Sequence, residues 1–249
     1  MKSLQHKNKF FIFIMLCVLS TPVLSANVRP YAGISVGASD GNSGKGSPNI
    51  TYVSGVPITD NYPVNDRNIL KTMISINGGY EYEGAHLRPA IALGLGLYTT
   101  PSDFHYKGHV VETITGDAAD TLYRYSYNIK TTRLMAEAQF SWLIKNLLPF
   151  ISIGVGPSWN RFNNYTESPV NSSGFVALPP FESHTNHHVA YQAGFGLGYD
   201  YCQERFAIGY RYVNLGQISS GTRGSEYPYA LKTGLFTTND IYLSYTHLF

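Results

Sequence analysis

The sequence predicts an all-β protein, an eight-stranded antiparallel transmembrane β-barrel of the outer-membrane type. Residues 241–249, at the C-terminus, alternate apolar with polar side chains, as a strand between lipid and a polar interior does. Seven earlier segments show the same alternation. The connections between the segments are alternately long and short, which is typical of barrels with long outer loops and short periplasmic turns.

Residues 1–26 have the features of a secretory signal peptide. Three lysines precede an apolar run at residues 10–19, and small or polar residues follow up to Ala26. The run is too short for a membrane helix, which needs about 20 residues. We therefore expect residues 1–26 to be removed, with Ser25 as the alternative cleavage position, and residues 27–249 to form the barrel domain.

The charge balance and the cysteine content argue against a nucleic-acid-binding protein and against a disulfide-stabilised one. The chain has 18 basic and 16 acidic residues, and 18 less the three signal-peptide lysines leaves 15 basic residues, so the net charge of the mature chain is near −1. This balance argues against a nucleic-acid-binding surface, which would be markedly basic. Cys202 is the only cysteine after residue 26, so no disulfide can form within the mature chain.

The first three strands are predicted at about residues 29–39, 71–82 and 86–99. A loop rich in Gly, Ser, Asn and Pro at residues 40–68 follows the first strand, and a short turn at residues 83–85 follows the second. Ten strands are the alternative, if Ile50 to Ile58 add a hairpin to the barrel. The side chains expected to face lipid are Ala32, Ile34, Val36, Ala38, Ile74, Ile76, Tyr80, Tyr82, Leu87, Ile91, Leu93, Leu95 and Leu97.

The next two strands are predicted at about residues 133–142 and 150–162, after a polar loop at residues 100–121. A short turn at residues 145–147 joins them. A run of alternating tyrosines just before the fourth strand predicts that this strand continues above the membrane: Tyr123, Tyr125 and Tyr127. The side chains expected to face lipid are Leu134, Ala136, Ala138, Phe140, Trp142, Ile151, Ile153, Val155 and Trp159.

The last three strands are predicted at about residues 187–201, 205–214 and 235–249. The connections before and between them are residues 163–186, 202–204 and 215–232. Their outward side chains would be Val189, Tyr191, Phe195, Leu197, Tyr199, Tyr201, Phe206, Ile208, Tyr210, Tyr212, Ile241, Leu243 and Tyr245. Exposed Tyr and Trp side chains would anchor the two membrane interfaces.

Two sequence runs and the last residue resemble a known family. The run Gly-Tyr-Arg-Tyr-Val-Asn-Leu-Gly at residues 209–216, the Tyr-Ala-Gly-Ile-Ser-Val-Gly run of the opening strand and the terminal Phe249 are similar to the opacity-protein-like surface antigens, relatives of the OmpA/OmpX-type eight-stranded barrels. The resemblance covers essentially the whole mature chain. It implies a place in the bacterial outer membrane with loops at the cell surface, and recognition of Phe249 by the barrel assembly machinery. Members differ in function, so no activity is implied.

Charged residues of both signs fall on the predicted inward faces. They are Arg29, Glu81, Arg88, Arg133, Glu137, Arg211 and Asp240. Buried charges are costly unless they pair and form hydrogen bonds, and the interior of an eight-stranded barrel is just wide enough for side chains to fill. We therefore interpret these seven residues as a structural network that plugs the lumen, in preference to a conduction or catalytic site.

Two other groups of residues have the side-chain types found in metal sites or in nucleophilic triads. His184, His187 and His188 lie close together, but no carboxylate or cysteine at a suitable spacing completes a metal site. The residue types of a nucleophilic triad occur at Ser102, Asp103, His105 and His109, although triads are defined by their geometry in space. We interpret both groups as polar loops, and we expect no metal, no cofactor and no catalytic residue.

These observations favour a surface protein with a structural or adhesive role, exerted through four outer loops. The expected partners are outer-membrane lipids and lipopolysaccharide, the barrel assembly machinery, and a host-cell or matrix surface. We expect a monomer. One alternative is an enzyme that modifies lipid A or phospholipid, which needs a Ser/His pair at the outer rim. The other is a narrow channel for small hydrophobic molecules, which needs an open upper lumen.

Overall fold

The computed structural model describes residues 28–43, 49–54, 56–83, 89–114, 120–170, 181–222 and 229–249. The predicted signal peptide and Arg88 lie outside these residues. Within them, secondary structure consists of fourteen β-strands. No helix in this part of the chain is long and apolar enough to cross a bilayer.

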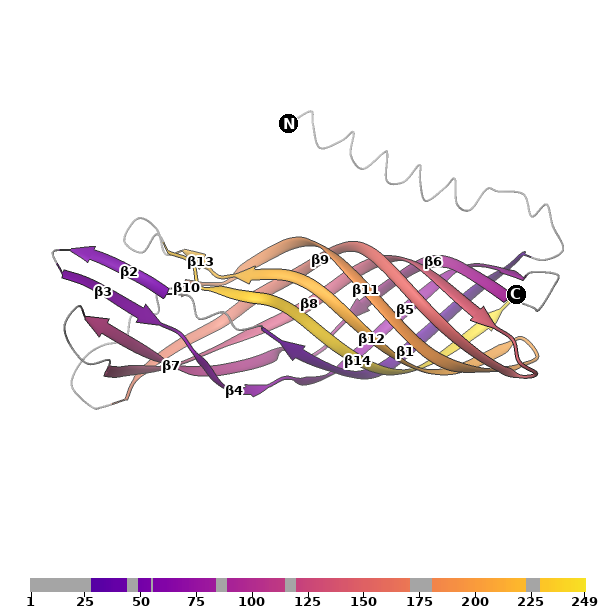
Figure 1. Cartoon of the computed structure of the whole chain (residues 1–249), viewed down its shortest axis with the longest axis horizontal. Helices are drawn as coiled ribbons and strands as arrows, with labels where there is room; N and C mark the ends of the chain where they lie inside the picture. Colours follow the sequence, from indigo (N-terminus) through magenta and orange to yellow (C-terminus); the bar gives the residue numbers. More distant parts are fainter. Residues whose placement is uncertain are drawn as a thin grey trace, which may run out of the picture.

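Eight of the described strands form a closed ring. In ring order they are β1 (Val28–Asn42), β5 (Leu70–Glu83), β6 (Pro89–Thr99), β8 (Asp120–Trp142), β9 (Leu147–Pro169), β11 (His184–Tyr201), β12 (Glu204–Ser219) and β14 (Lys232–Leu248). Every pairing around the ring is antiparallel, and β14 closes it against β1, where Ile34 lies opposite Tyr245. The predicted eight-stranded barrel is therefore confirmed, and Figure 1 shows its strongly tilted strands.

The outside of the barrel is apolar. Leu93, Phe195 and Ile241 are each 58–60% exposed, whereas inward neighbours such as Ser75 and Glu81 are buried. An apolar belt around a closed wall would be unfavourable in water and is suited to lipid. Exposed aromatic side chains lie near the periplasmic strand ends, among them Tyr82, Trp142, Tyr199 and Tyr201. The protein is an outer-membrane barrel in contact with membrane lipid.

Two of the predicted short turns, at residues 145–147 and 202–204, lie where the alternation placed them, whereas the third, at residues 83–85, lies mostly outside the described residues. Lys145, between β8 and β9, has a φ of 60°, and Cys202, between β11 and β12, has a φ of 57°. A positive φ at these positions lets the chain reverse within very few residues. The side chain of Cys202 is exposed.

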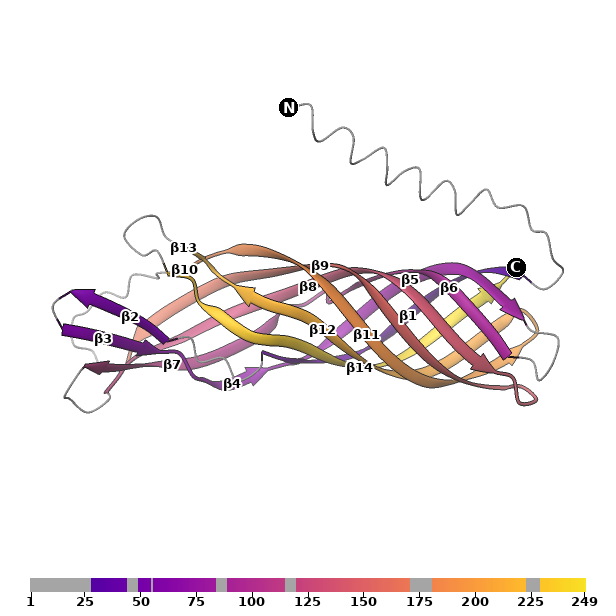
Figure 2. The same cartoon turned by 45° about the horizontal axis from the view of Figure 1, so that its top comes forward.

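The four long connections, predicted as polar surface loops, contain strands over much of their described length, and in this respect the prediction was wrong. They contain β2 (Asn49–Ser54), β3 (Val56–Asn61), β4 (Val64–Asn68), β7 (Phe104–Ile114), β10 (Phe181–Glu182) and β13 (Gly221–Thr222). β7 pairs with the first half of β8, and β3 and β4 pair with β7. Both views show this additional sheet at the end of the barrel opposite the C-terminus (Figures 1 and 2). The hairpin β2–β3 stands outside the ring, so the barrel does not have ten strands.

The outer part has an aromatic core of its own, inside the extended sheet. Its members are at most 8% exposed and comprise Tyr62, Phe104, Tyr106, Tyr125, Tyr127, Phe162, Tyr165, Phe181 and Phe236. The rings of Tyr127 and Phe162 stack with centroids 4.9 Å apart, and those of Tyr165 and Phe181 meet edge to face at 4.9 Å. The tyrosines before residue 133 thus continue β8 above the membrane, as predicted. The described parts of the predicted loop 163–186, residues 163–170 and 181–186, are tied to this core by Tyr165 and Phe181.

Candidate functional site in the barrel lumen

A buried ion pair crosses the outer part of the lumen. The Nη2 atom of Arg133, on β8, lies 2.6 Å from Oδ2 of Asp240, on β14, and their side chains are 2% and 0% exposed. The hydroxyl of Ser39, on β1, donates a hydrogen bond of 2.6 Å to the other carboxylate oxygen of Asp240. Both oxygens of this carboxylate are therefore satisfied inside the barrel.

Tyr98, on β6, connects this pair to a second one. Its ring lies close to two guanidinium groups, with Cζ of Arg133 at 4.7 Å and Cζ of Arg211 at 4.3 Å from the ring centre, distances at which a cation is attracted to the ring face. Its hydroxyl donates a 2.5 Å hydrogen bond to Glu137. Glu137 lies 3.7 Å from Arg211 and also accepts from the amide of Gln192.

A second charged cluster lies nearer the periplasmic end. Arg205, on β12, pairs through Nη1 with Glu81, on β5, at 2.5 Å, and through Nε with Asp200 at 2.6 Å. Arg29 adds a longer contact to Glu81 at 3.3 Å and pairs with Glu83 at the rim. The side chain of Glu81 is 1% exposed, so its carboxylate depends on these two arginines for neutralisation.

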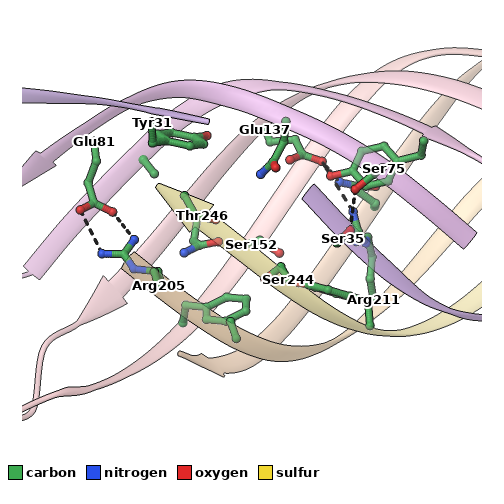
Figure 3. Close-up of a pocket in the computed structure, with 18 residues that line it drawn as sticks. Tyr31, Ser35, Ser75, Glu81, Glu137, Ser152, Arg205, Arg211, Ser244 and Thr246 are labelled. Atoms are coloured by element: carbon green, nitrogen blue, oxygen red, sulfur yellow. Dashed lines mark hydrogen bonds and ion pairs between the residues drawn. The ribbon is translucent and has the colours of Figure 1, made fainter. Parts of the chain in front are cut away.

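A small polar chamber lies between the two clusters. Figure 3 shows Glu81 facing Arg205 in its lining, with Glu137 and Arg211 farther along. The side chains between them are mostly hydroxyls and amides, namely Ser35, Ser75, Asn77, Gln139, Ser152, Ser244 and Thr246. The chamber volume is about 70 Å³. Since one water needs roughly 10–15 Å³ measured in this way, the chamber has room for a few waters.

The structure brings six of the seven predicted lumen charges into these clusters; Arg88 lies outside the described residues. Sequence reasoning missed Arg205, which carries the periplasmic cluster, and Tyr98, which joins the outer pairs. A signal for Arg205 was present, because residues 205 and 211 share parity on one strand and so face the same side. The same parity applied to Tyr98, which alternates with the outward Leu95 and Leu97 and so faces the side of Arg88, but the period could not show that its ring meets two arginines from other strands.

The candidate triad and histidine residues make other contacts. The Nδ1 atom of His105 lies 2.6 Å from Oδ1 of Asn128, and Nδ1 of His109 accepts from the amide of Asn65 at 2.8 Å. The carboxylate of Asp103 accepts from Asn163 at 3.2 Å. The described side-chain hydrogen bonds of His105, His109 and Asp103 are thus made with asparagine side chains, and not with one another as in a catalytic triad. Among the described residues, no group of three or more His, Cys, Asp or Glu side chains is arranged to hold a metal ion.

Glu167, a carboxyl group beside the aromatic core of the outer part, has a raised pKa. Burial raises the pKa of Glu167, on β9, to about 7, and the nearby charge of Asp60, on β3, acts in the same direction. The hydroxyl of Tyr165 donates a hydrogen bond to Glu167, which opposes the shift. Burial and the charge of Glu167 in turn raise the pKa of Tyr165. This carboxyl changes charge near neutral pH inside the part of the barrel that faces the exterior.

Phe249 lies at the seam where the barrel closes. Its backbone N–H donates to the carbonyl of Pro30, on β1, at 3.0 Å, and its ring meets the ring of His247 at 4.7 Å. The side chain is 64% exposed. A partner could therefore reach the ring from outside.

Comparisons with known proteins find structural neighbours but no family. No protein-family model matches the sequence, and a search of curated proteins found no match. Among solved structures, the chain is similar to Neisserial surface protein A, with 9% identity, a TM-score of 0.45 and coverage of 88% of this chain and 97% of that one. It is also similar to Ail of Yersinia pestis, with 12% identity, a TM-score of 0.37 and coverage of 88% and 98%. For OprG of Pseudomonas aeruginosa the values are 14%, 0.34, 90% and 96%. At such identities the similarity concerns the fold.

Proposed function

We propose that the protein is a surface-display barrel, with a structural or adhesive role carried by its outer sheet, and that the lumen charges are a structural plug. The observation that carries this proposal is the Arg133–Asp240 pair, which spans the lumen with both side chains buried. Because this pair blocks the lumen, the surface available for binding a partner is the one outside the barrel. The paired strands and aromatic core above the membrane support the same reading, because they hold that surface rigid.

The lining of the chamber argues against a channel for hydrophobic molecules. Its side chains are mainly hydroxyls, amides and charged groups, and a volume of about 70 Å³ is too small for most organic substrates. The environments of His105 and His109 give no support to a lipid-modifying enzyme, because their described hydrogen bonds go to Asn128 and Asn65. A display role requires neither an open lumen nor a catalytic pair.

The test replaces the hairpin β2–β3, residues 49–61, by a short Gly/Ser linker and leaves Tyr62 in the aromatic core. Cells expressing the wild type should adhere to host-cell or matrix surfaces, and the hairpin variant should assemble normally and adhere less. Lys145→Gly, in a turn on the periplasmic side, is the matched control and should adhere like the wild type. Assembly is checked by the change in gel mobility on heating.

Two results would contradict the proposal. The first is that wild-type protein gives cells no added adhesion in any of these assays. The second is that purified wild type conducts a steady current in planar bilayers, which would require an open path past Arg133 and Asp240. A change in the mass of lipid A in expressing cells, abolished by His105→Ala, would instead support an enzyme.

A further inference from the structure

The outward face of β7, β8 and β9 carries basic side chains from the membrane rim upward. The backbone pairing places Lys130, on β8, opposite Arg161, on β9. Both side chains are exposed, while their chain neighbours Ile129 and Phe162 are fully buried. Because side chains alternate along a strand, Lys130 and Arg161 point away from the barrel. Two like charges side by side repel, unless an anion neutralises them.

This basic pair lies directly above the lipid belt. Trp159 is the outward residue that precedes Arg161 on β9 and is 37% exposed, and His187 lies opposite it on β11. Farther down the same strands the outward side chains are mostly apolar, including Val155 and Val189. Trp side chains favour the level of the lipid headgroups, so the cations next to Trp159 lie where headgroup phosphates are found.

A groove continues the basic face farther from the membrane. It has a volume of about 490 Å³, and its lining includes Asn65, Lys107, His109, Arg124, Ser126, Thr166 and Ser168. Lys107 and Arg124 are exposed, and Ser126 and Thr166 share a hydrogen bond of 2.8 Å. Arg124 lies six residues from Lys130 on β8, which is about 20 Å along an extended strand.

The acidic residues near this face are few in the described part of the chain. Among the side chains that the structure describes, which leave out those of residues 66–68, no carboxylate forms an ion pair with Lys107, Arg124, Lys130 or Arg161. Asp103 lies near the lower pair and is half-buried, and its carboxylate accepts a hydrogen bond from Asn163 at 3.2 Å. Lys130 and Arg161 therefore present two positive charges with Asp103 as the described carboxylate nearby.

We propose that this face binds a lipopolysaccharide molecule of the outer leaflet, with Lys130 and Arg161 on the phosphates next to its acyl chains and the groove at Lys107 and Arg124 on anionic groups of its core sugars. The position of the face favours this ligand over a soluble polyanion. The cations lie on the side wall and continue directly from the lipid belt, where the neighbours are lipids. Arg and Lys form strong charge-assisted hydrogen bonds with phosphate.

The test compares ligands and variants with the full mature chain in detergent micelles. Lipopolysaccharide, enzymatically dephosphorylated lipopolysaccharide and the soluble sulfated glycan heparin are titrated against wild type, Lys130→Gln/Arg161→Gln and Lys107→Gln/Arg124→Gln. Lys232→Gln is the matched control, because Lys232 is an exposed lysine on β14, on the opposite side of the ring. All four positions of the double variants are exposed, so the heat-dependent gel shift should persist in every variant.

We expect the Lys130/Arg161 variant to bind lipopolysaccharide roughly tenfold or more weakly, since each cation near an anionic surface contributes on the order of 1 kcal/mol. Removal of the phosphates should weaken wild-type binding by a similar factor and leave that variant little changed. The Lys107/Arg124 variant should lose less, and Lys232→Gln nothing. Wild-type affinity in the Lys130/Arg161 variant overturns the proposal. So does loss of heparin binding without loss of lipopolysaccharide binding, which would assign the face to a soluble polyanion.

Discussion

Arg133 and Asp240 form an ion pair between opposite sides of the barrel. Three strands separate β8 from β14 in one direction around the ring, namely β6, β5 and β1, and three in the other, namely β9, β11 and β12. The 2.6 Å contact between Nη2 of Arg133 and Oδ2 of Asp240 is therefore a tie across the full width of the lumen. Ladder hydrogen bonds join only adjacent strands, so this pair adds a connection that the backbone cannot make.

Removing one partner of this pair should destabilise the barrel more than removing both. Asp240→Leu leaves Arg133 buried without its carboxylate, and breaking a buried pair in this way typically costs about 3–5 kcal/mol. The double variant Arg133→Met/Asp240→Leu should recover a large part of that loss, because no unpaired charge remains at the contact. Free energies of unfolding in guanidinium, followed by tryptophan fluorescence, complete the double-mutant cycle. Additive effects would show that the two side chains act independently.

Glu137→Leu should also lower the free energy of unfolding, by about 3–5 kcal/mol. The substitution removes the acceptor of Tyr98 and Gln192 and the carboxylate 3.7 Å from Arg211. Glu83→Gln is the control, because Glu83 is 46% exposed and pairs with Arg29 at the rim; an exposed pair contributes about 1 kcal/mol or less. An unchanged denaturant midpoint for Glu137→Leu would mean that the outer cluster does not stabilise the barrel.

The outer sheet should lose stability as pH rises toward neutrality. The pKa of Glu167 is raised to about 7 from an ordinary value of 4.5, so the folded state holds this proton more tightly than the unfolded state. The protonated Glu167 carboxyl therefore adds to the free energy of unfolding. This stabilisation is fully present below pH 4.5 and is lost as pH rises through 7, and it amounts to at most about 3 kcal/mol. Glu167→Gln should remove this pH dependence and protect the outer strands at pH 8.

Limited proteolysis of the outer strands between pH 4 and pH 8 measures this effect without unfolding the membrane part. The cleavage rate of the wild type should rise with pH, whereas that of Glu167→Gln should stay nearly constant after correction for the protease's own pH profile. Glu182→Gln, an exposed carboxylate on β10, serves as the control and should behave like the wild type. Parallel pH profiles for all three proteins would show that Glu167 does not limit the stability of this region.

The membrane part of the fold could be read from the sequence because lipid imposes a strict rule on it. Every outward position must be apolar, so the two-residue period fixes both the strands and their facing. Leu93 and Glu81 illustrate this, since one is exposed on the belt and the other buried inside. The same period could not identify the partner of a lumen charge. Arg133 contacts a residue 107 positions away, and only the closure of the ring brings the two together.

The outer sheet was missed because its polar composition was taken as evidence for loops. β7 in fact alternates: Phe104 and Tyr106 are buried, whereas His105 and Lys107 are not. Above the membrane the outward positions may be polar without penalty, so the average composition resembles a loop although the period is that of a strand. Attention to period in residues 100–121 would have identified this strand.

Replacement of Phe249 by a charged residue should affect assembly much more than the stability of the finished barrel. The ring is 64% exposed and its described ring contact is with His247, so little buried apolar area is lost with it. We expect Phe249→Asp to lower outer-membrane levels several-fold and to increase periplasmic degradation, as a role in recognition by the assembly machinery requires. The same variant, refolded in detergent, should unfold near the wild-type midpoint, because its backbone N–H can still donate to Pro30.

Tyr201→Ser, which removes another exposed aromatic ring at the periplasmic end (62% exposed), is the control and should reach normal levels. Normal outer-membrane levels of Phe249→Asp would refute the role in recognition, and an equal loss in the refolding assay would show that Phe249 acts by stabilising the seam.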